Sequence, residues 1–548
     1  MRPAHSFDYI VLGAGSAGCV LANRLSADPD CRVLLIEAGP PDHNPLLRVP
    51  VLAGRWFTGK YLNWAFTTEP QPQLNNRTIP WPRGRVLGGS SSINGMIYAR
   101  GHPQDFARWS AGGLRDWSLE RVLPYFRRAE RFLDGGDDWR GGSGPLPVDR
   151  PRVPAGAEIY AAFIQAGQQA GFRYCESFNS RDPEGVGYYE YNIVRGRRWS
   201  AARAYLDPAR CRANLCVLTH ARVLKVMLER GVAQGVEVLV GGEKQQLRAD
   251  REVLLACGAI GSPAVLLHSG IGDAGALMAL GIPVVADRKS VGMNLQDHCH
   301  TMVTHATPLR DGVYDLRRLD RAVLSVLQAL TLGTGLATVF PTLAGAFLRS
   351  DPELSDPDIQ LHFILGAGER NLRYPFSRHQ GYQGNGFNGS FCQLRPESRG
   401  RVFLKHSDPL QSPGIDPNYL SSEADRRTAR AGFRMVRDIF RQPAFEAVRG
   451  LELAPGQAVQ SDGDIDRWIA ANAGTIYHPV GSCRMGSDPD SVVDEQLRVR
   501  GVERLRVIDA SVMPILVSAN THAATVMIAE RGADFILHGV MSCRPSSS

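Results

Sequence analysis

Short apolar runs on either side of a glycine-rich turn mark the first forty residues of the chain. Residues 7–12 (FDYIVL) and 31–36 (CRVLLI) are the mostly apolar runs, and between them lie the turn GAGSAG and a segment with the composition of a helix. Such short, nearly continuous runs are typical of strands buried in a parallel sheet. The pattern therefore predicts a strand, a tight turn, a helix and a second strand.

This turn has the spacing of a dinucleotide-binding site. Gly13 permits the tight turn, Gly15 lets the main chain approach a pyrophosphate, and Gly18 lets the helix pack closely on the strand. Glu37 follows 19 residues after Gly18 and can accept a hydrogen bond from a ribose hydroxyl while repelling a 2′-phosphate. A purely structural glycine turn is the alternative, but it requires neither the flanking strands nor the acid. The predicted site also includes three neighbours of these residues, Ser16, Ala17 and Ala38.

Strand-like and helix-like patterns continue along the chain without an internal repeat or a low-complexity linker. Apolar runs predict strands within 214–227, 253–257, 359–365 and 402–404, and an amphipathic pattern predicts a helix at 422–440. A chain of 548 residues is too long for one ordinary core, so we expect two packed domains.

The predicted fold class is α/β, or α+β overall, with a Rossmann-like nucleotide-binding domain and a discontinuous substrate domain built on an antiparallel sheet covered by helices. The nucleotide-binding domain is expected from residues 1–150, 211–293 and 474–540. The substrate domain is expected from residues 151–210 and 294–473, and residues 541–548 form a tail.

Residues 322–348 carry no charge and are long enough to be considered as a membrane span. Polar residues and glycines interrupt them, so a helix, a glycine break and a buried strand are predicted instead. Peripheral contact with a membrane is kept as an alternative.

Composition narrows the classes of function. The formal net charge is +7, but only five of the 62 basic residues are Lys, and they are scattered, so nucleic-acid binding is not expected. The ten cysteines include no CxxC pair, which argues against a disulfide framework or a zinc site and favours a reducing compartment. No basic and apolar leader opens the chain, so a cytoplasmic location is expected, with the inner-membrane surface as the alternative.

Four ordered motifs resemble those of the glucose-methanol-choline (GMC) oxidoreductases. They are the segments 84–95 (GRVLGGSSSING), 258–263 (GAIGSP), 477–486 (YHPVGSCRMG), and 507–511 (VIDAS) together with 518–522 (SANTH). The resemblance extends over nearly the whole chain and is closest to bacterial alcohol and choline dehydrogenases. It implies that FAD occupies the dinucleotide site, which leaves no room there for NAD or NADP.

The resemblance also implies further cofactor contacts. The main chain of the small-residue loop can reach the flavin or its phosphates. Asp509 is expected to face the ribityl or pyrophosphate group, with a helix cap as the alternative, and His522 the flavin pyrimidine. Val223 is expected to meet the adenine, with a core position as the alternative. The remaining predicted contacts are Arg85, Gly88, Gly89, Ser90, Asn94, Gly95, Ala510 and Thr525.

The resemblance implies that His478 and Asn520 are the catalytic pair. Alcohol oxidation requires removal of the hydroxyl proton as the carbinol hydride leaves, and an imidazole suits the role of base. Asn cannot be the base at neutral pH, so Asn520 is expected to hold the substrate oxygen. A structural histidine and a turn asparagine are the alternatives.

Two other histidines, His298 and His300, are expected on one face of a strand. No third ligand follows from the spacing, so no metal site is predicted, and a structural or solvent role is expected for both. Residues 366–387 are expected to form a loop over the pocket, in which Arg370, Arg373 and Arg378 are more simply solvated than bound to a carboxylate.

The predicted function is FAD-dependent oxidation of an aliphatic or aromatic primary alcohol to the aldehyde, with electrons passed to a quinone or similar acceptor. Choline dehydrogenase and an oxygen-using alcohol oxidase are the alternatives within the class, and an FAD-containing hydroxynitrile lyase is the alternative outside it. A choline site would need aromatic rings or an acid around the ammonium group. The sequence leaves the oligomeric state open.

The state of the flavin gives a first prediction. Some members of the family hold FAD covalently through a histidine directly before the asparagine of the small-residue loop, and this chain has Ile93 there. The purified protein should be yellow, and acid or heat should release all of its FAD into the supernatant. Flavin that stays with the precipitated protein would contradict non-covalent binding.

Overall fold

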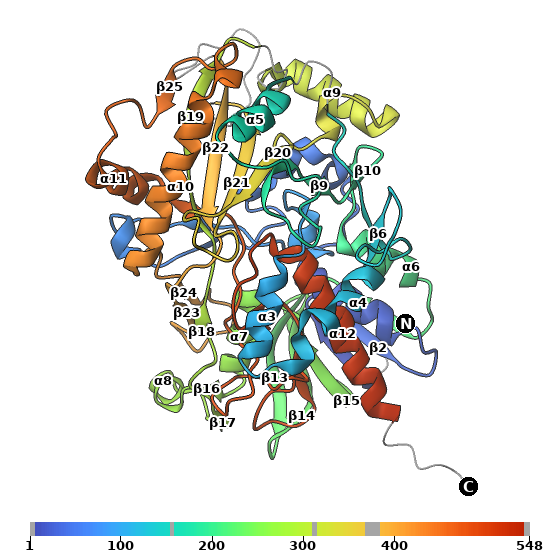
Figure 1. Cartoon of the computed structure of the whole chain (residues 1–548). Helices are drawn as coiled ribbons and strands as arrows, with labels where there is room; N and C mark the ends of the chain where they lie inside the picture. The colour runs from blue at the N-terminus through green and yellow to red at the C-terminus, as the bar shows by residue number, and fades with distance from the viewer. Residues whose placement is uncertain (1–5, 154–157, 310–314, 368–383, 542–548) are drawn as a thin grey trace.

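Two seven-stranded sheets form the framework of the molecule (Figure 1). The computed structural model describes residues 6–153, 158–309, 315–367 and 384–541. One sheet lies in the lower half of the view and the other in the upper half, where α5, α10 and α11 surround it. The strands of each sheet come from several separated stretches of the chain.

The first sheet combines a parallel layer with an antiparallel meander, in the order β12-β2-β1-β15-β14-β13, with β27 also paired to β15. Long strand β15 takes part in both, because its first half pairs antiparallel with β14 and its second half pairs parallel with β1 and β27. The strands are β1 Ser6–Leu12, β2 Val33–Ile36, β12 Leu215–Leu218, β13 Ala221–Glu229, β14 Val232–Val240, β15 Glu243–Leu255 and β27 Leu505–Val507.

The predicted strand, turn, helix and strand at the N-terminus are confirmed. The turn enters helix α1 (Ser16–Leu25) through Gly13, whose φ of +92° is one that only glycine adopts without strain. Helix α1 packs against the C-terminal helix α12 (Thr521–Met541), so segments from the beginning and the end of the sequence lie side by side.

The second sheet is antiparallel, in the order β25-β19-β22-β21-β20-β8, with β26 also paired to β19. Its strands are β8 Gly185–Tyr188, β19 Cys299–Thr307, β20 Ala344–Leu348, β21 Ile359–Leu365, β22 Asn385–Gln393, β25 Glu452–Ala454 and β26 Gly474–Thr475. Helix α10 (Glu423–Arg441), predicted at 422–440 and capped by Ser422, packs on β22 and β19, while α5 (Glu158–Gln169) and α11 (Asp462–Asn472) pack against α10. The predicted antiparallel sheet covered by helices is therefore confirmed.

The strands of the first sheet all fall within the ranges predicted for the nucleotide-binding domain. Those of the second fall within the ranges predicted for the substrate domain, apart from β26 at the 473/474 boundary. The domain boundaries themselves stay a prediction.

The uncharged segment 322–348 folds as predicted. Helix α9 (Leu319–Leu332) ends at Gly333 in the left-handed conformation, and buried strand β20 follows. No described helix is long and apolar enough to cross a bilayer.

Smaller elements complete the described fold. The remaining α-helices are α2 Ala53–Thr58, α3 Pro103–Ala111, α4 Leu119–Ala129, α6 Asp207–Ala209, α7 Gly258–His268 and α8 Ala274–Ala279. Short paired strands are β3 Phe66–Thr67 with β4 Pro80–Trp81, β5 Ile97–Tyr98 with β9 Glu190–Tyr191, β6 Glu130–Phe132 with β7 Leu146–Val148, β10 Ile193–Val194 with β11 Arg197–Arg198, β16 Ile271–Gly272 with β17 Ala286–Asp287, and β18 Met293–Leu295 with β23 Gly400–Phe403 and β24 Gly414–Asp416.

Gly18 offers a test of the packing between α1 and the turn. A Cβ at Gly18 would lie 1.9 Å from the main-chain oxygen of Gly13, so the turn would have to move. Gly18→Ala should cost about 1–3 kcal/mol of stability from overpacking, more than the roughly 1 kcal/mol that alanine gains over glycine within a helix. The matched control is Gly54→Ala in α2, where the added Cβ meets nothing within 4 Å. The midpoint temperature of thermal unfolding and the FAD content should both be lower than in the parent for Gly18→Ala alone. Equal values for the two variants would contradict this account of the turn.

Candidate active site

One cavity of about 550 Å³ extends from the carboxyl ends of β1 and β2 to His478. It is lined by residues that come from both sheets and from the loops between them. Of the residues predicted from sequence, the following line it: Gly13, Gly15, Ser16, Ala17, Glu37, Ala38, Arg85, Gly89, Ser90, Asn94, Gly95, Val223, His478, Asp509, Ala510, Asn520, His522 and Thr525.

Two predicted residues, Gly18 and Gly88, do not line the cavity. Gly18 lies at the contact between α1 and the Gly13 turn. Gly88 belongs to the small-residue loop, and its N–H donates to the carbonyl oxygen of Ala14 at 2.7 Å. Gly18 thus packs α1 on its own turn and Gly88 joins the two glycine loops, so their contribution to a cofactor site is indirect.

The nucleotide end of the cavity is built around Glu37. Its carboxylate accepts hydrogen bonds from the N–H groups of Ala14 at 3.0 Å and Gly39 at 2.8 Å. Burial raises the pKa of Glu37 to about 7, and a buried carboxyl group gains from further hydroxyl donors such as those of a ribose. A Cβ at Gly15 would meet no protein atom within 4 Å, so the main chain there is open to the cavity. This open main chain at the start of α1 fits a pyrophosphate, as the spacing predicts.

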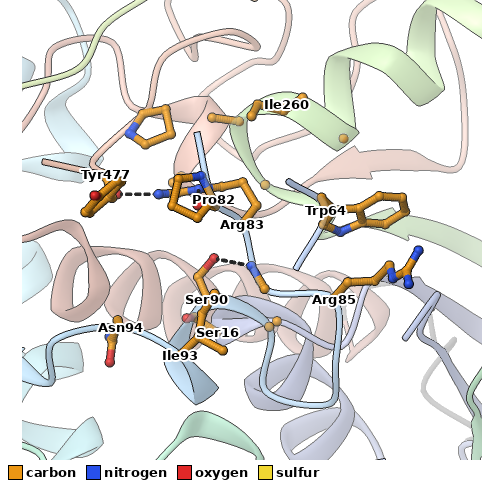
Figure 2. A pocket seen from close by; sticks show the side chains of 18 of the residues that line it. Ser16, Trp64, Pro82, Arg83, Arg85, Ser90, Ile93, Asn94, Ile260 and Tyr477 are labelled. Atoms are coloured by element: carbon orange, nitrogen blue, oxygen red, sulfur yellow. Dashed lines mark hydrogen bonds between the residues drawn. The ribbon is translucent and has the colours of Figure 1, made fainter. Parts of the chain in front are cut away.

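Figure 2 shows the wall of the cavity next to its nucleotide end. Ser16, Ser90, Ile93 and Asn94 lie along one side, and Trp64 and Arg85 lie together at another. The guanidinium of Arg85 lies 5.7 Å from the centre of the Trp64 ring.

Arg198 is a buried cation that the sequence analysis missed. Its guanidinium donates to the side-chain oxygen of Asn94 at 2.7 Å and to the carbonyl oxygens of Leu47 and Ser91, and it makes no ion pair among the described residues. Its Nη2 is buried without a partner, and burial lowers the pKa of Arg198 to about 9, so it is charged at neutral pH. A positive charge directly behind Asn94 fits a cofactor that carries negative charge.

Asp509 lines the cavity and caps the turn that follows it, while its contact with a ribityl or pyrophosphate group stays a prediction. It accepts from the N–H of Ser511 within the 3-10 turn Ala510–Val512, which is the capping contact. Its other oxygen accepts from the N–H of Gly258 at 2.8 Å and from the hydroxyl of Ser262. Asp509 thereby joins the start of α7 to the C-terminal segment at the floor of the cavity.

The main chain around His478 is fixed by three hydrogen bonds. The N–H of His478 donates to Asp297 at 2.7 Å, the N–H of Tyr477 donates to the Thr475 hydroxyl at 2.7 Å, and the carbonyl oxygen of Tyr477 accepts from Arg83 at 2.7 Å, a bond drawn in Figure 2. These bonds hold Tyr477 at a φ of +73°, which is strained for a bulky residue. His478 is therefore presented from a segment with little freedom to move.

The side chain of His478 is bonded at both ring nitrogens. Its Nδ1 lies 2.9 Å from Nδ1 of His298, and its Nε2 lies 3.1 Å from Nδ2 of Asn520. His298 in turn has its Nε2 at 3.0 Å from the carbonyl oxygen of Leu394.

These contacts assign the tautomer of each ring. A carbonyl oxygen only accepts, so Nε2 of His298 carries the hydrogen and its Nδ1 accepts. Nδ1 of His478 must then be the donor between the two histidines, which leaves a lone pair on Nε2 of His478.

The hydrogen bonds on the Asn520 side of His478 agree with this assignment of tautomers. The Tyr189 hydroxyl donates to the Leu361 carbonyl oxygen at 2.8 Å, so it accepts from the Gln360 amide at 3.3 Å. Gln360 also donates to the side-chain oxygen of Asn520 at 3.2 Å, which turns the Asn520 NH₂ group toward His478. The lone pair on Nε2 of His478 is thus set independently from both sides.

The electrostatic environment keeps these rings neutral. Burial lowers the pKa of His478 well below its usual value of 6.5, with smaller contributions from His298, His362 and Arg83. Burial likewise lowers the pKa of His298 to about 4. At neutral pH, His478 is therefore an unprotonated base whose free nitrogen is Nε2.

The other predicted histidine, His522, lies elsewhere in the cavity. Its Nδ1 is 3.0 Å from the Ser16 hydroxyl at the start of α1, and burial lowers the pKa of His522 to about 4. His522 makes no described hydrogen bond to His478, so the structure groups it with the cofactor contacts rather than with the catalytic pair.

The interpretation of His298 and His300 needs correction. Only His300 lies in strand β19, while His298 precedes it and contacts His478 rather than sharing a strand face or meeting solvent. His300 has its Nδ1 3.0 Å from the Ser390 hydroxyl and lines the cavity. The His298 contact spans 180 positions of sequence, so no local pattern indicates it.

Most of the predicted pocket loop 366–387, including Arg370, Arg373 and Arg378, lies outside the described residues. Among the described residues, no group of three His, Cys, Asp or Glu side chains is arranged to hold a metal ion.

The fold and the site together fit a dinucleotide-binding enzyme with a neutral histidine at the far end of its cofactor cavity. Comparison with known proteins gives the family. Two models described as GMC oxidoreductase match residues 7–300 and 396–529. The chain therefore belongs to the GMC oxidoreductases, is an FAD flavoprotein, and acts on CH–OH donors.

Individual relatives match over nearly their full length. The chain is 42% identical to the mitochondrial choline dehydrogenase of Mus musculus, over 97% of this chain and 89% of the other. It is also 42% identical to an alcohol dehydrogenase [acceptor] of Pseudomonas putida, over 97% of this chain and 96% of the other. The crystal structure of pyridoxine 4-oxidase from Mesorbium loti is similar with a TM-score of 0.86 and 34% identity, over 97% and 99% of the two chains.

The pKa of His478 leads to a prediction for pH dependence. The base must be unprotonated, and burial lowers its pKa, so the rate constant for flavin reduction should stay level as pH falls from 8 through 6.5 and decline only below that value. Anaerobic stopped-flow measurement across this range is the test. A decline centred at or above pH 6.5 would show that the base is not a desolvated imidazole.

Proposed function

We propose that the protein oxidises a primary alcohol to its aldehyde, with His478 as the general base and Asn520 as the residue that holds the substrate oxygen. The observation that carries this proposal is the lone pair on Nε2 of His478, which faces the Asn520 NH₂ group inside the cavity that fits FAD. Bound FAD supplies the hydride acceptor.

The roles of the two residues follow from their hydrogen bonds. A substrate hydroxyl placed between them would donate to Nε2 of His478 and accept from Nδ2 of Asn520. Proton transfer to Nε2 makes His478 a cation, whose Nδ1–H remains bonded to the neutral His298. His298 is a positioning residue, because it fixes the ring and its tautomer without touching the substrate.

A quinone or similar molecule is the electron acceptor that we propose, by analogy with the acceptor-linked relative. A cytoplasmic location, with contact at the inner membrane surface as the alternative, stays a prediction. Choline is the second candidate substrate, because choline dehydrogenases are among the relatives at 42% identity.

Replacement of the base tests the proposal. His478→Ala should retain FAD but reduce it with alcohols on the order of 10² times more slowly, or worse, as expected for loss of a general base. The matched control is His406→Ala at an exposed position, which should behave as the parent.

Anaerobic bleaching of the flavin by a panel of alcohols is the measurement. A hydroxynitrile lyase would leave the flavin oxidised with every alcohol in the panel. A near-parental rate for His478→Ala would place the base elsewhere, with His522 as the first candidate.

A further inference from the structure

Alternate residues of the second sheet form the substrate end of the cavity. His300 and Met302 of β19, and His362 and Ile364 of β21, line the cavity because residues two apart on a strand point to the same side. Ser390 of β22 lies between these strands, paired in register with both Met302 and His362. This surface faces His478 and Asn520, which line the same cavity.

The imidazoles of His300, His362 and His478 lie at the substrate end of the cavity. His362 is 4% exposed, its ring stacks on Tyr189 with centres 5.3 Å apart, and its buried Nδ1 has no partner. His300 lines the same cavity, with its Nδ1 3.0 Å from the hydroxyl of Ser390, the residue paired in register with His362. Phe340, Met302 and Ile364 make the rest of the described wall largely apolar.

No carboxylate faces these rings among the described lining residues. The acids that line the cavity within the described ranges are Glu37 and Asp509, and both are bonded to main-chain N–H groups at the cofactor end. Asp297 lies behind His478, and its oxygens accept from the His478 N–H, the Thr475 hydroxyl and the Tyr419 hydroxyl.

The substrate end of the cavity disfavours a positively charged group. Burial and the neighbouring histidines lower the pKa of His362 to about 3. An imidazole can lose its proton in such a site, but a quaternary ammonium ion cannot lose its charge. Phe57 and Tyr477, with ring centres 5.0 Å apart, supply aromatic surface at the wall. Their attraction for a cation is modest compared with the cost of burying an unpaired ion.

We propose that this end of the cavity selects uncharged primary alcohols with an apolar body over choline, and that His300 is the residue that determines this selectivity. The inference rests on the proposed oxidation of an alcohol and specifies its substrate class. It separates this chain from the choline dehydrogenases to which it is similar.

The sharpest comparison uses two alcohols of one shape. In 3,3-dimethyl-1-butanol a carbon atom replaces the nitrogen of choline, so the pair differs in charge and hardly in size. The parent enzyme should show kcat/KM at least 100-fold higher for the uncharged alcohol. His300→Glu places a carboxylate beside the substrate and should lower this ratio at least 10-fold, while the neutral variant His300→Gln should keep it within about 3-fold of the parent.

Binding without turnover provides a second measurement. The methyl ethers of the two alcohols cannot be oxidised in the same way, and their dissociation constants can be read from the perturbed flavin spectrum. The parent should bind the uncharged ether more tightly than the cationic ether. His300→Glu should bring the two dissociation constants closer together. FAD content and thermal unfolding establish that each variant is folded, and the comparison within the parent stands if a variant is not.

The outcomes separate the two proposals. If neither alcohol reduces the flavin but the uncharged ether still binds more tightly, the proposed oxidation fails while the selectivity stands. Equal or better use and binding of the cationic compounds by the parent would overturn the selectivity. An unchanged ratio in His300→Glu would overturn the role of His300.

Discussion

A single continuous chain of hydrogen bonds determines what this cavity can do. It runs from the Leu394 carbonyl through His298, His478, Asn520 and Gln360 to Tyr189 and the Leu361 carbonyl. Both ends are main-chain acceptors, so the position of every hydrogen between them follows. Of the two imidazole lone pairs in the series, that on Nδ1 of His298 accepts from His478, and that on Nε2 of His478 lies at the cavity. The rest of the architecture buries most of these side chains and holds them in place.

Two separate parts of the structure contribute residues to this chain of hydrogen bonds. His478 and Asn520 belong to C-terminal segments that also hold Asp509 and the start of α12, beside the cofactor end of the cavity. Their partners and both terminal carbonyls belong to the second sheet or to the residues next to it. The base is therefore formed only when the second sheet lies correctly against the cofactor cavity. Burial then lowers the pKa of His478 and keeps it ready to accept a proton.

The sequence predicts the cofactor end of the site better than the catalytic network. Gly13, Gly15 and Glu37 lie within 25 residues of one another, and local geometry carries their meaning. Strand β21 and helix α10 likewise follow from local apolar and amphipathic patterns. The contact of His298 with His478, and the buried cation Arg198 behind Asn94, depend on packing between distant segments. Arg198 stands in an arginine-rich stretch that gives no sign of burial.

The alternation of side chains along the second sheet has an evolutionary consequence. On β21, Leu361 anchors the hydrogen-bond chain through its carbonyl, while His362, the next residue, lines the substrate end. Before β19, His298 sets the tautomer of His478, and His300, two residues later, lines the cavity. Mutations that reshape these strands for a new alcohol will also disturb proton removal. Lineages that change substrate are thus expected to pass through slower intermediates, or to accept first those replacements that preserve the backbone course of both strands.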